Sequence, residues 1–204
     1  MTYQPSTPVK RGGAAVGLRY AIGYLVAIWA VHLLNLFFFG GRLNAFGIQP
    51  RDTAGLLGVV FAPFLHGGFN HLISNSIPGA IFCFLVAATS RRTWWEVSTI
   101  VLLVSGLGTW FFGGVNTVHI GASGMIYGWL AYLIVRGFFN RSLRQIGLGV
   151  LLGIGYSGLI WGVLPINEGV SWQAHLFGAL GGIFAGLVIS SDDPVRPRAV
   201  NSVP

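Results

Sequence analysis

The chain has 204 residues, of which 53% are hydrophobic and only 8% are charged. A soluble globular domain carries about a quarter charged residues, so this composition excludes a fold with an ordinary polar surface. It indicates that a lipid bilayer surrounds most of the chain. The formal net charge of +7 does not indicate nucleic-acid binding. The basic residues stand in short clusters between apolar runs, which is typical of membrane proteins.

Apolar runs of about 20 residues, the length that spans a bilayer as a helix, predict six transmembrane segments. They cover residues 20–39, 69–89, 95–113, 118–135, 145–164 and 171–190. We therefore predict an all-α, polytopic membrane protein with a polar tail at residues 1–19, a membrane domain at 20–190 and a second tail at 191–204. The first run is too long for the core of a signal peptide, so we expect an uncleaved anchor.

The positions of lysine and arginine predict the orientation, because cytoplasmic loops carry an excess of both. Ten of the twelve fall on the side that holds both termini, and the other side holds only Arg42 and Arg51. Both termini are therefore expected in the cytoplasm. The external connection at residues 40–68 contains apolar stretches and is expected to lie partly in the membrane interface. Eleven of the twelve are arginine, which is typical of GC-rich bacterial genomes, so we expect a bacterial cell membrane.

Polar side chains inside the predicted spans are costly in a bilayer, which makes each a functional candidate. The candidates are His32, His71, Asn75, Ser123, Tyr127 and His175, with His66 and His119 at the edges of spans. Each has a structural interpretation when taken alone, because a lone serine can lie in a close helix crossing and a lone histidine can pack in the core. We interpret His32 and the single cysteine, Cys83, as structural.

Four of the candidates lie at a similar depth in the predicted membrane, which the structural interpretation of each residue taken alone does not explain. His71, Asn75, Ser123 and His175 lie in the outer halves of the second, fourth and sixth spans. His71 and Asn75 are four residues apart, so they share one helix face. Three helices can therefore converge on one polar pocket below the outer surface.

Glycines favour that convergence, because small residues let helix backbones approach closely in a membrane. Gly124 and Gly128 form a G-x-x-x-G pattern in the fourth span, and Gly178 and Gly182 form a second one in the sixth. A serine and a histidine on separate helices need such an approach to meet at about 3 Å.

Three segments resemble the motifs of the rhomboid family, in matching order and on matching spans. They are Gly121-Ala-Ser-Gly124 with Tyr127 and Gly128, then Ala174-His175-x-x-Gly178, and His71-x-x-x-Asn75 with Phe64-Leu65-His66-Gly67 before it. The resemblance covers residues 20–190. It implies a rhomboid-like bundle and an intramembrane serine endopeptidase without metal or cofactor. The implied substrates are single-span membrane proteins that are cut near the outer surface.

The resemblance also implies the role of each site residue. Ser123 is the nucleophile and His175 the general base of a dyad without a third acid. His71, Asn75 and the backbone amide of Ser123 would stabilise the oxyanion. Tyr127 would pack against His175. The first loop departs from the family pattern: many members carry a Trp-Arg pair there, whereas residues 40–68 contain no tryptophan, and Arg51 is a candidate substitute.

Other classes of protein fit the sequence less well. A membrane zinc protease needs His-Glu-x-x-His, and no histidine here is followed by glutamate. An aspartyl protease needs two aspartates inside spans, and a Gly-x-Ser-x-Gly elbow is excluded by Met125 at its last position. Two alternatives stay open. The chain could be a catalytically silent rhomboid-like protein that binds membrane clients, or a small transporter, which would require acidic residues at the midplane.

Overall fold

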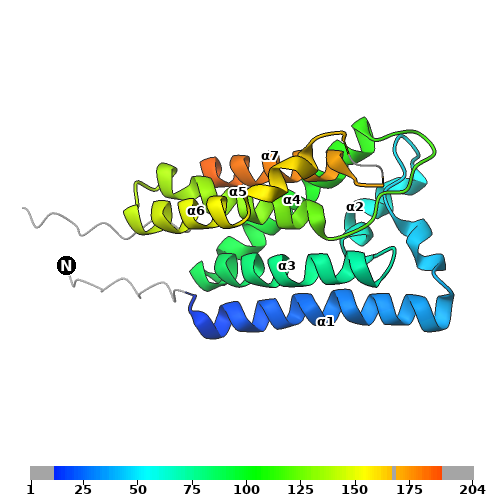
Figure 1. Ribbon diagram of the computed structural model, residues 1–204, viewed down its shortest axis with the longest axis horizontal. Coiled ribbons are helices and arrows are strands. Elements are labelled where there is room, and N and C mark those ends of the chain that lie inside the picture. The colour runs from blue at the N-terminus through cyan, green and yellow to red at the C-terminus, as the bar shows by residue number, and fades with distance from the viewer. Residues whose placement is uncertain (1–11, 167–168, 190–204) are drawn as a thin grey trace, which may run out of the picture.

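The computed structural model describes residues 12–166 and 169–189, and every regular element in this part of the chain is helical (Figure 1). The long helices are α1 (Ala14–Phe39), α3 (Phe69–Thr89), α4 (Arg91–Phe112), α5 (Ser123–Phe139), α6 (Leu143–Gly155) and α7 (Trp172–Val188). The prediction of an all-α, six-helix membrane protein is confirmed. Residues 1–11 of the first predicted tail, residue 190 and the whole second tail at 191–204 lie outside the described residues.

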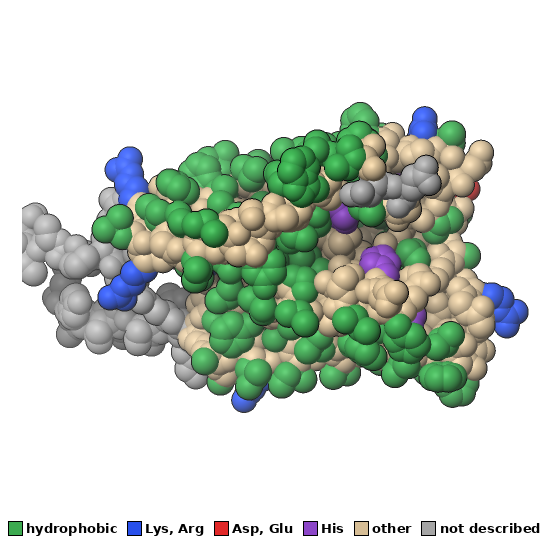
Figure 2. Space-filling model, viewed as in Figure 1, with side chains coloured by type: hydrophobic (Ala, Val, Ile, Leu, Met, Phe, Trp, Pro, Cys, Tyr) green, Lys and Arg blue, Asp and Glu red, His purple; other side chains and the backbone are tan. Residues whose placement is uncertain are grey.

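The described surface is that of a protein surrounded by lipid, because large apolar side chains are exposed along the helices (Figure 2). Three helices, α1, α3 and α4, are long and apolar enough to span a bilayer alone. Helix α6 and the 3-10 helix η4 (Ser157–Val163), which is bent from it by 69°, are long and apolar enough only when taken together. Helices α5 and α7 have 17 residues each.

The helices pack around α5 and α7, which lie against each other (Figure 1). Helix α4 covers α7, α6 covers α5, and α1 packs on the far side of α3. The buried core is apolar and is shared by five helices. Its members include Phe82, Val86, Val97, Val101, Ile126, Trp129, Leu133, Leu152 and Ala185.

The connection between α1 and α3 is folded against one end of the bundle. It contains η1 (Arg42–Phe46), η2 (Ala54–Leu57), α2 (Gly58–Phe61) and η3 (Ala62–Phe64). The Arg51 guanidinium donates a hydrogen bond to the Gly113 carbonyl at 2.8 Å, and the Trp110 indole donates to the Asp52 carbonyl at 2.7 Å. Both hydrogen bonds tie this connection to the end of α4.

The predicted start of the fourth span was wrong. Helix α5 begins at Ser123 and not at residue 118, because the preceding segment is extended. His119 and Ile48 exchange backbone hydrogen bonds of 2.9 Å in an antiparallel bridge. Gly121 then adopts φ 117°, which favours glycine. Non-helical backbone at membrane depth is tolerated where protein buries it or where it lines a cavity.

The other boundaries differ in smaller ways. Helix α1 begins at Ala14 and α4 at Arg91, earlier than predicted. The fifth segment is not one straight helix over residues 145–164, since it breaks near Tyr156 and continues as η4. The second predicted span, residues 69–89, coincides with α3.

Candidate active site

Ser123 is the first residue of α5, at the point where the extended segment turns into helix. The first N–H groups of a helix have no acceptor within the helix, and the helix dipole favours negative charge there. The hydroxyl therefore stands beside backbone donors of α5. Gly121 precedes it, with its N–H bonded to the Ala62 carbonyl at 2.9 Å.

His175 faces Ser123 from the fourth residue of α7. Its Nε2 lies 2.7 Å from the Ser123 hydroxyl oxygen, which is hydrogen-bond distance. Its Nδ1 lies 2.8 Å from the Gly162 carbonyl oxygen. Both ring nitrogens are thus within hydrogen-bond distance of protein groups. The imidazole is buried, with 7% of the residue exposed.

The glycines of α5 and α7 account for this short distance. A Cβ added at Gly178 would overlap the Gly124 carbonyl, and one added at Gly182 would overlap the Gly128 carbonyl. A Cβ at Gly124 would overlap the Ser105 hydroxyl. The two backbones thus touch with no side chain between them.

Tyr127 lies one turn after Ser123 and covers the histidine. The two rings are stacked, with centroids 4.1 Å apart and planes 7° apart. The Tyr127 hydroxyl donates to the Leu159 carbonyl of η4 at 2.7 Å. A flat ring against the imidazole restricts its rotation.

His71 and Asn75 face the same space from α3. A Cβ built on Gly121 would lie 2.5 Å from the His71 Nε2 and 3.7 Å from the Asn75 Nδ2, so the missing side chain of Gly121 makes room for both. Asn75 is 4% exposed, and its Nδ2 has no hydrogen-bond partner within the described residues. A buried donor of this kind is costly unless a ligand uses it.

One cavity of about 820 Å³ connects these groups. Ser123, His175, His71, Asn75 and Tyr127 all line it, so the structure brings together the side chains that the sequence singled out. Figure 2 shows histidine side chains in a hollow between the upper and lower helices. The site is therefore open to a ligand from the surface of the bundle.

Comparison with known proteins agrees with the motifs. The Rhomboid domain family matches residues 53–192, which is more than half of the chain. The chain belongs to the rhomboid family. It is 39% identical to an uncharacterised protein of Mycobacterium tuberculosis over 94% of this chain and 85% of that one.

More distant relatives carry protease names. YdcA of Bacillus subtilis, provisionally named a rhomboid protease, is 31% identical over 58% of this chain and 59% of its own. Rhomboid-like protease 5 of Toxoplasma gondii is 27% identical over 68% of this chain and 17% of its own. These names describe those two proteins.

Some residues that shape this rhomboid site were missed by the sequence argument. The Ser105 hydroxyl of α4 donates to the Ala174 carbonyl at 2.9 Å, beside His175 in the chain. Ser105 is a polar residue inside a span, so the rule that selected the other candidates could have found it. The carbonyl contacts of Gly162 and Leu159 carry no sequence signal, because every residue has a carbonyl.

His119 ties the segment before Ser123 to the start of α7. Its Nδ1 lies 2.6 Å from the Ser171 hydroxyl and its Nε2 lies 2.9 Å from the Thr117 hydroxyl. Burial lowers the pKa of His119, so the neutral ring is the form that these contacts hold. His119 also lines the cavity.

The remaining candidates lie outside the cavity wall. His32 is buried and contacts the edge of Phe69, with ring centroids 5.0 Å apart. His66 is buried behind His71, with centroids 5.0 Å apart. Cys83 is buried in the core. Among the described residues, no group of histidine, cysteine and acidic side chains is arranged to hold a metal ion.

Proposed function

We propose that this rhomboid is an intramembrane serine endopeptidase with Ser123 as nucleophile and His175 as general base. The observation that carries the proposal is the 2.7 Å contact between the Ser123 hydroxyl and His175 Nε2, two side chains that line one cavity. A silent relative would need neither the contact nor the unpartnered donor of Asn75 opposite it.

The geometry supports acylation in the usual order. The Ser123 oxygen attacks the scissile carbonyl carbon while His175 Nε2 takes the hydroxyl proton. His71, Asn75 and the N–H groups of the first turn of α5 would donate to the oxyanion that forms. The C–N bond then breaks, His175 gives its proton to the leaving amine, and the acyl group stays on Ser123 as an ester.

Deacylation repeats the sequence with water. His175 Nε2 takes a proton from a water molecule, which attacks the ester carbonyl, and then returns a proton to the Ser123 oxygen as the ester bond breaks. A cavity of about 820 Å³ leaves room for both a peptide segment and water.

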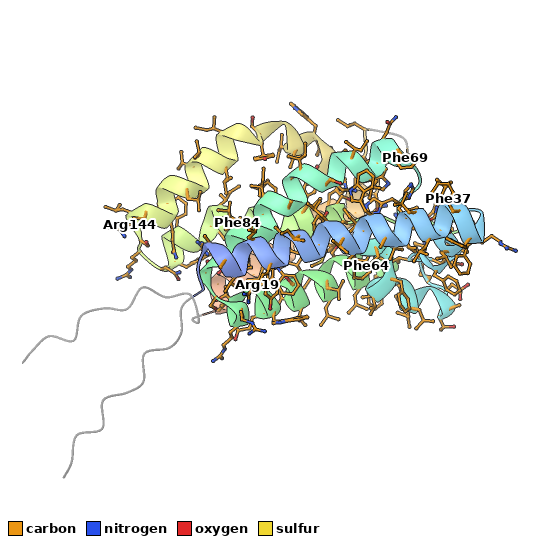
Figure 3. The ribbon with its side chains drawn as sticks, turned by 90° about the horizontal axis from the view of Figure 1, so that it is seen from below. Arg19, Phe37, Phe64, Phe69, Phe84 and Arg144 are labelled. Carbon is orange, nitrogen blue, oxygen red and sulfur yellow. The ribbon has the colours of Figure 1, made fainter. Side chains whose placement is uncertain are left out.

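The proposed substrates are membrane proteins with a single span. Their scissile segment must be extended, because a helical backbone is internally hydrogen-bonded and shielded from attack. We propose that cleavage takes place near the outer surface, because the cavity lies at the end of the bundle where α3, α5 and α7 begin. Arg19 and Arg144 lie toward the opposite end from Phe37 and Phe69 (Figure 3).

That orientation has its own test. Reporter fusions at residues 92 and 142 should give cytoplasmic signals, and a fusion at residue 167 should give an external one. A cytoplasmic signal at residue 167 would place the site at the inner surface and would contradict the proposed orientation.

The activity is tested by labelling the purified protein with a fluorophosphonate and mapping the adduct by mass spectrometry. We expect one adduct, on Ser123, that disappears in Ser123→Ala and in His175→Ala. Ser74→Ala is the matched control, because Ser74 is an exposed hydroxyl that lines the same cavity but donates to the His71 carbonyl of its own helix and not to His175. A folded wild-type protein that takes no label and cleaves no model substrate would support the silent, client-binding alternative.

A further inference from the structure

The bent end of the fifth span, η4, lies over the Ser123–His175 pair and presents two backbone carbonyls to it. The Gly162 carbonyl oxygen is 2.8 Å from His175 Nδ1, and the Leu159 carbonyl accepts from the Tyr127 hydroxyl at 2.7 Å. Both stacked rings are therefore hydrogen-bonded to the same short helix. That helix supplies neither the nucleophile nor the proposed oxyanion donors.

The contact with Gly162 fixes where the histidine proton lies. A carbonyl oxygen can only accept a hydrogen bond, so Nδ1 must carry the proton. A neutral imidazole has one N–H, and Nε2 is then left with a lone pair facing the Ser123 hydroxyl. This is the tautomer that a general base needs.

A serine–histidine–aspartate triad uses a carboxylate for the same purpose. The acidic residues within the described part of the chain are Asp52 and Glu96, and neither lines the cavity. The Gly162 carbonyl occupies the corresponding place on the far side of the ring.

The break in the fifth span explains why a carbonyl is available there. Carbonyls in the last turn of a helix have no N–H partner within it, and η4 ends at Val163. The 69° bend directs this end toward the rings. Gly162 also has to be small, because a Cβ there would overlap the Tyr127 hydroxyl and lie 3.1 Å from His175 Nδ1.

We infer that η4 is the positioning element of the dyad, with the Gly162 carbonyl holding His175 as the Nδ1-protonated tautomer and the Leu159 carbonyl keeping Tyr127 stacked on it. The effect of η4 on catalysis rests on the proposed function. The tautomer of His175 does not, since it can be measured in a protein that has no proteolytic activity.

The first test compares two glycines of η4. In Gly162→Ala the added methyl group displaces Tyr127 and His175, and we expect kcat to fall about 10²-fold or more with KM within about 3-fold. Gly158→Ala is the matched control, because a Cβ there meets no described atom within 4 Å and kcat should stay within about 2-fold.

The second test is a rescue. Tyr127→Phe removes the hydroxyl that the new methyl group would overlap but keeps the stacked ring. By itself, this substitution should lower kcat about 5-fold, which is the effect expected from the loss of one hydrogen bond. Combined with Gly162→Ala it should restore kcat to about 10-fold above the Gly162→Ala value. A double variant less active than either single variant would contradict the inference.

The third test reads the tautomer directly, by nitrogen NMR of histidine-labelled protein in bilayers, with the His175 signals assigned from the spectrum of His175→Ala. We expect the proton on Nδ1 in wild type and equally in inactive Ser123→Ala, because Gly162 holds it without help from the serine. Gly162→Ala should show a mixture of tautomers. A wild-type His175 protonated on Nε2 would overturn the inference outright. Unaltered cleavage by Ser123→Ala would instead overturn the proposed function and leave the tautomer result standing.

Discussion

On the α5/α7 side of the cavity, the polar atoms of the Ser123–His175 pair already have partners. The Ser123 hydroxyl and both ring nitrogens of His175 are within hydrogen-bond distance of protein groups, and the backbones of α5 and α7 touch at Gly124 and Gly178. On the α3 side, the Asn75 Nδ2 and the His66 Nε2 are buried without a partner among the described residues. In the same cavity, the dyad on one wall is thus hydrogen-bonded within the protein, whereas the Asn75 amide on the other wall is not.

This difference in hydrogen bonding indicates that a ligand would bind to the polar groups of the α3 wall. A buried donor without a partner costs about 1–3 kcal/mol, so the α3 wall carries a cost that the α5/α7 wall does not. Donors fixed in advance are useful where negative charge develops during a reaction. We therefore expect changes on the α5/α7 wall to affect both stability and chemistry, and changes at Asn75 to affect chemistry alone.

The largest effect is expected for the dyad. Ser123→Ala and His175→Ala should each lower cleavage of a model transmembrane substrate by about 10⁴-fold or more, and the double variant should be little worse, because the two act as a unit. Membrane insertion should survive, since each change removes polar surface. Cleavage assays on matched amounts of folded protein measure this. Undiminished cleavage by Ser123→Ala would exclude Ser123 as nucleophile.

The next effect separates the two walls. Asn75→Ala and His71→Ala should each lower kcat by about 10²–10³-fold with little change in KM, as the loss of one oxyanion donor does. Because the Asn75 Nδ2 has no partner in the described structure, Asn75→Ala should leave the melting temperature unchanged or slightly higher. Turnover and melting temperature should be measured on the same detergent-purified samples. Normal turnover with weakened stability would remove Asn75 from the site.

A glycine of the helix contact should change stability and activity together. In Gly178→Ala the new methyl group overlaps the Gly124 carbonyl, so α7 must move away from α5. A displacement of about 1 Å costs roughly 10²-fold in rate, and overpacking costs about 1–3 kcal/mol in stability. Both kcat and melting temperature should fall.

Gly147→Ala is the control for that variant. Gly147 lies in α6, and a Cβ there meets nothing within 4 Å among the described atoms. Replacing a helical glycine with alanine should stabilise the protein by up to about 1 kcal/mol and leave kcat unchanged. A Gly178→Ala protein that behaves like Gly147→Ala would show that the close contact is not required.

The two walls also differ in how far the sequence could predict them. Ser123, His175, His71 and Asn75 were predicted because each is a polar group inside an apolar span, where its cost is visible in the sequence. The close approach of α5 and α7 was predicted for the same kind of reason, since the paired glycines are visible as a spacing.

Apart from the Ser105 hydroxyl, what escaped prediction depends on backbone atoms. The late start of α5 results from the bridge between His119 and Ile48, and β-pairing between distant segments leaves little trace in one sequence. The bend before η4 and the carbonyl contacts of Gly162 and Leu159 involve groups that every residue has. The apolar pattern of residues 145–164 is the same for a straight helix and a broken one.

The smallest expected effect is acid sensitivity behind the α3 wall of the cavity. His66 lies before α3, and burial is the main cause that lowers its pKa to about 4, with nearby His71 as a further cause. The unfolded chain has a histidine pKa of about 6.5 and so binds this proton more readily. The stability from the neutral ring is therefore fully present above about pH 6.5 and is lost as pH falls toward 4.

Replacing His66 with a residue that does not titrate tests the predicted loss of stability at low pH. Between pH 7.5 and pH 5, linkage of one such site lowers the free energy of unfolding by about 2 kcal/mol. His66→Gln keeps a polar side chain that does not titrate, so its melting temperature should fall less over this range than that of wild type. His119, whose pKa burial also lowers, is present in both proteins and contributes equally to each curve. The difference between the two curves thus isolates His66. Parallel curves would mean that His66 is hydrated in the folded protein, and that the wall behind His71 is less dry than its burial indicates.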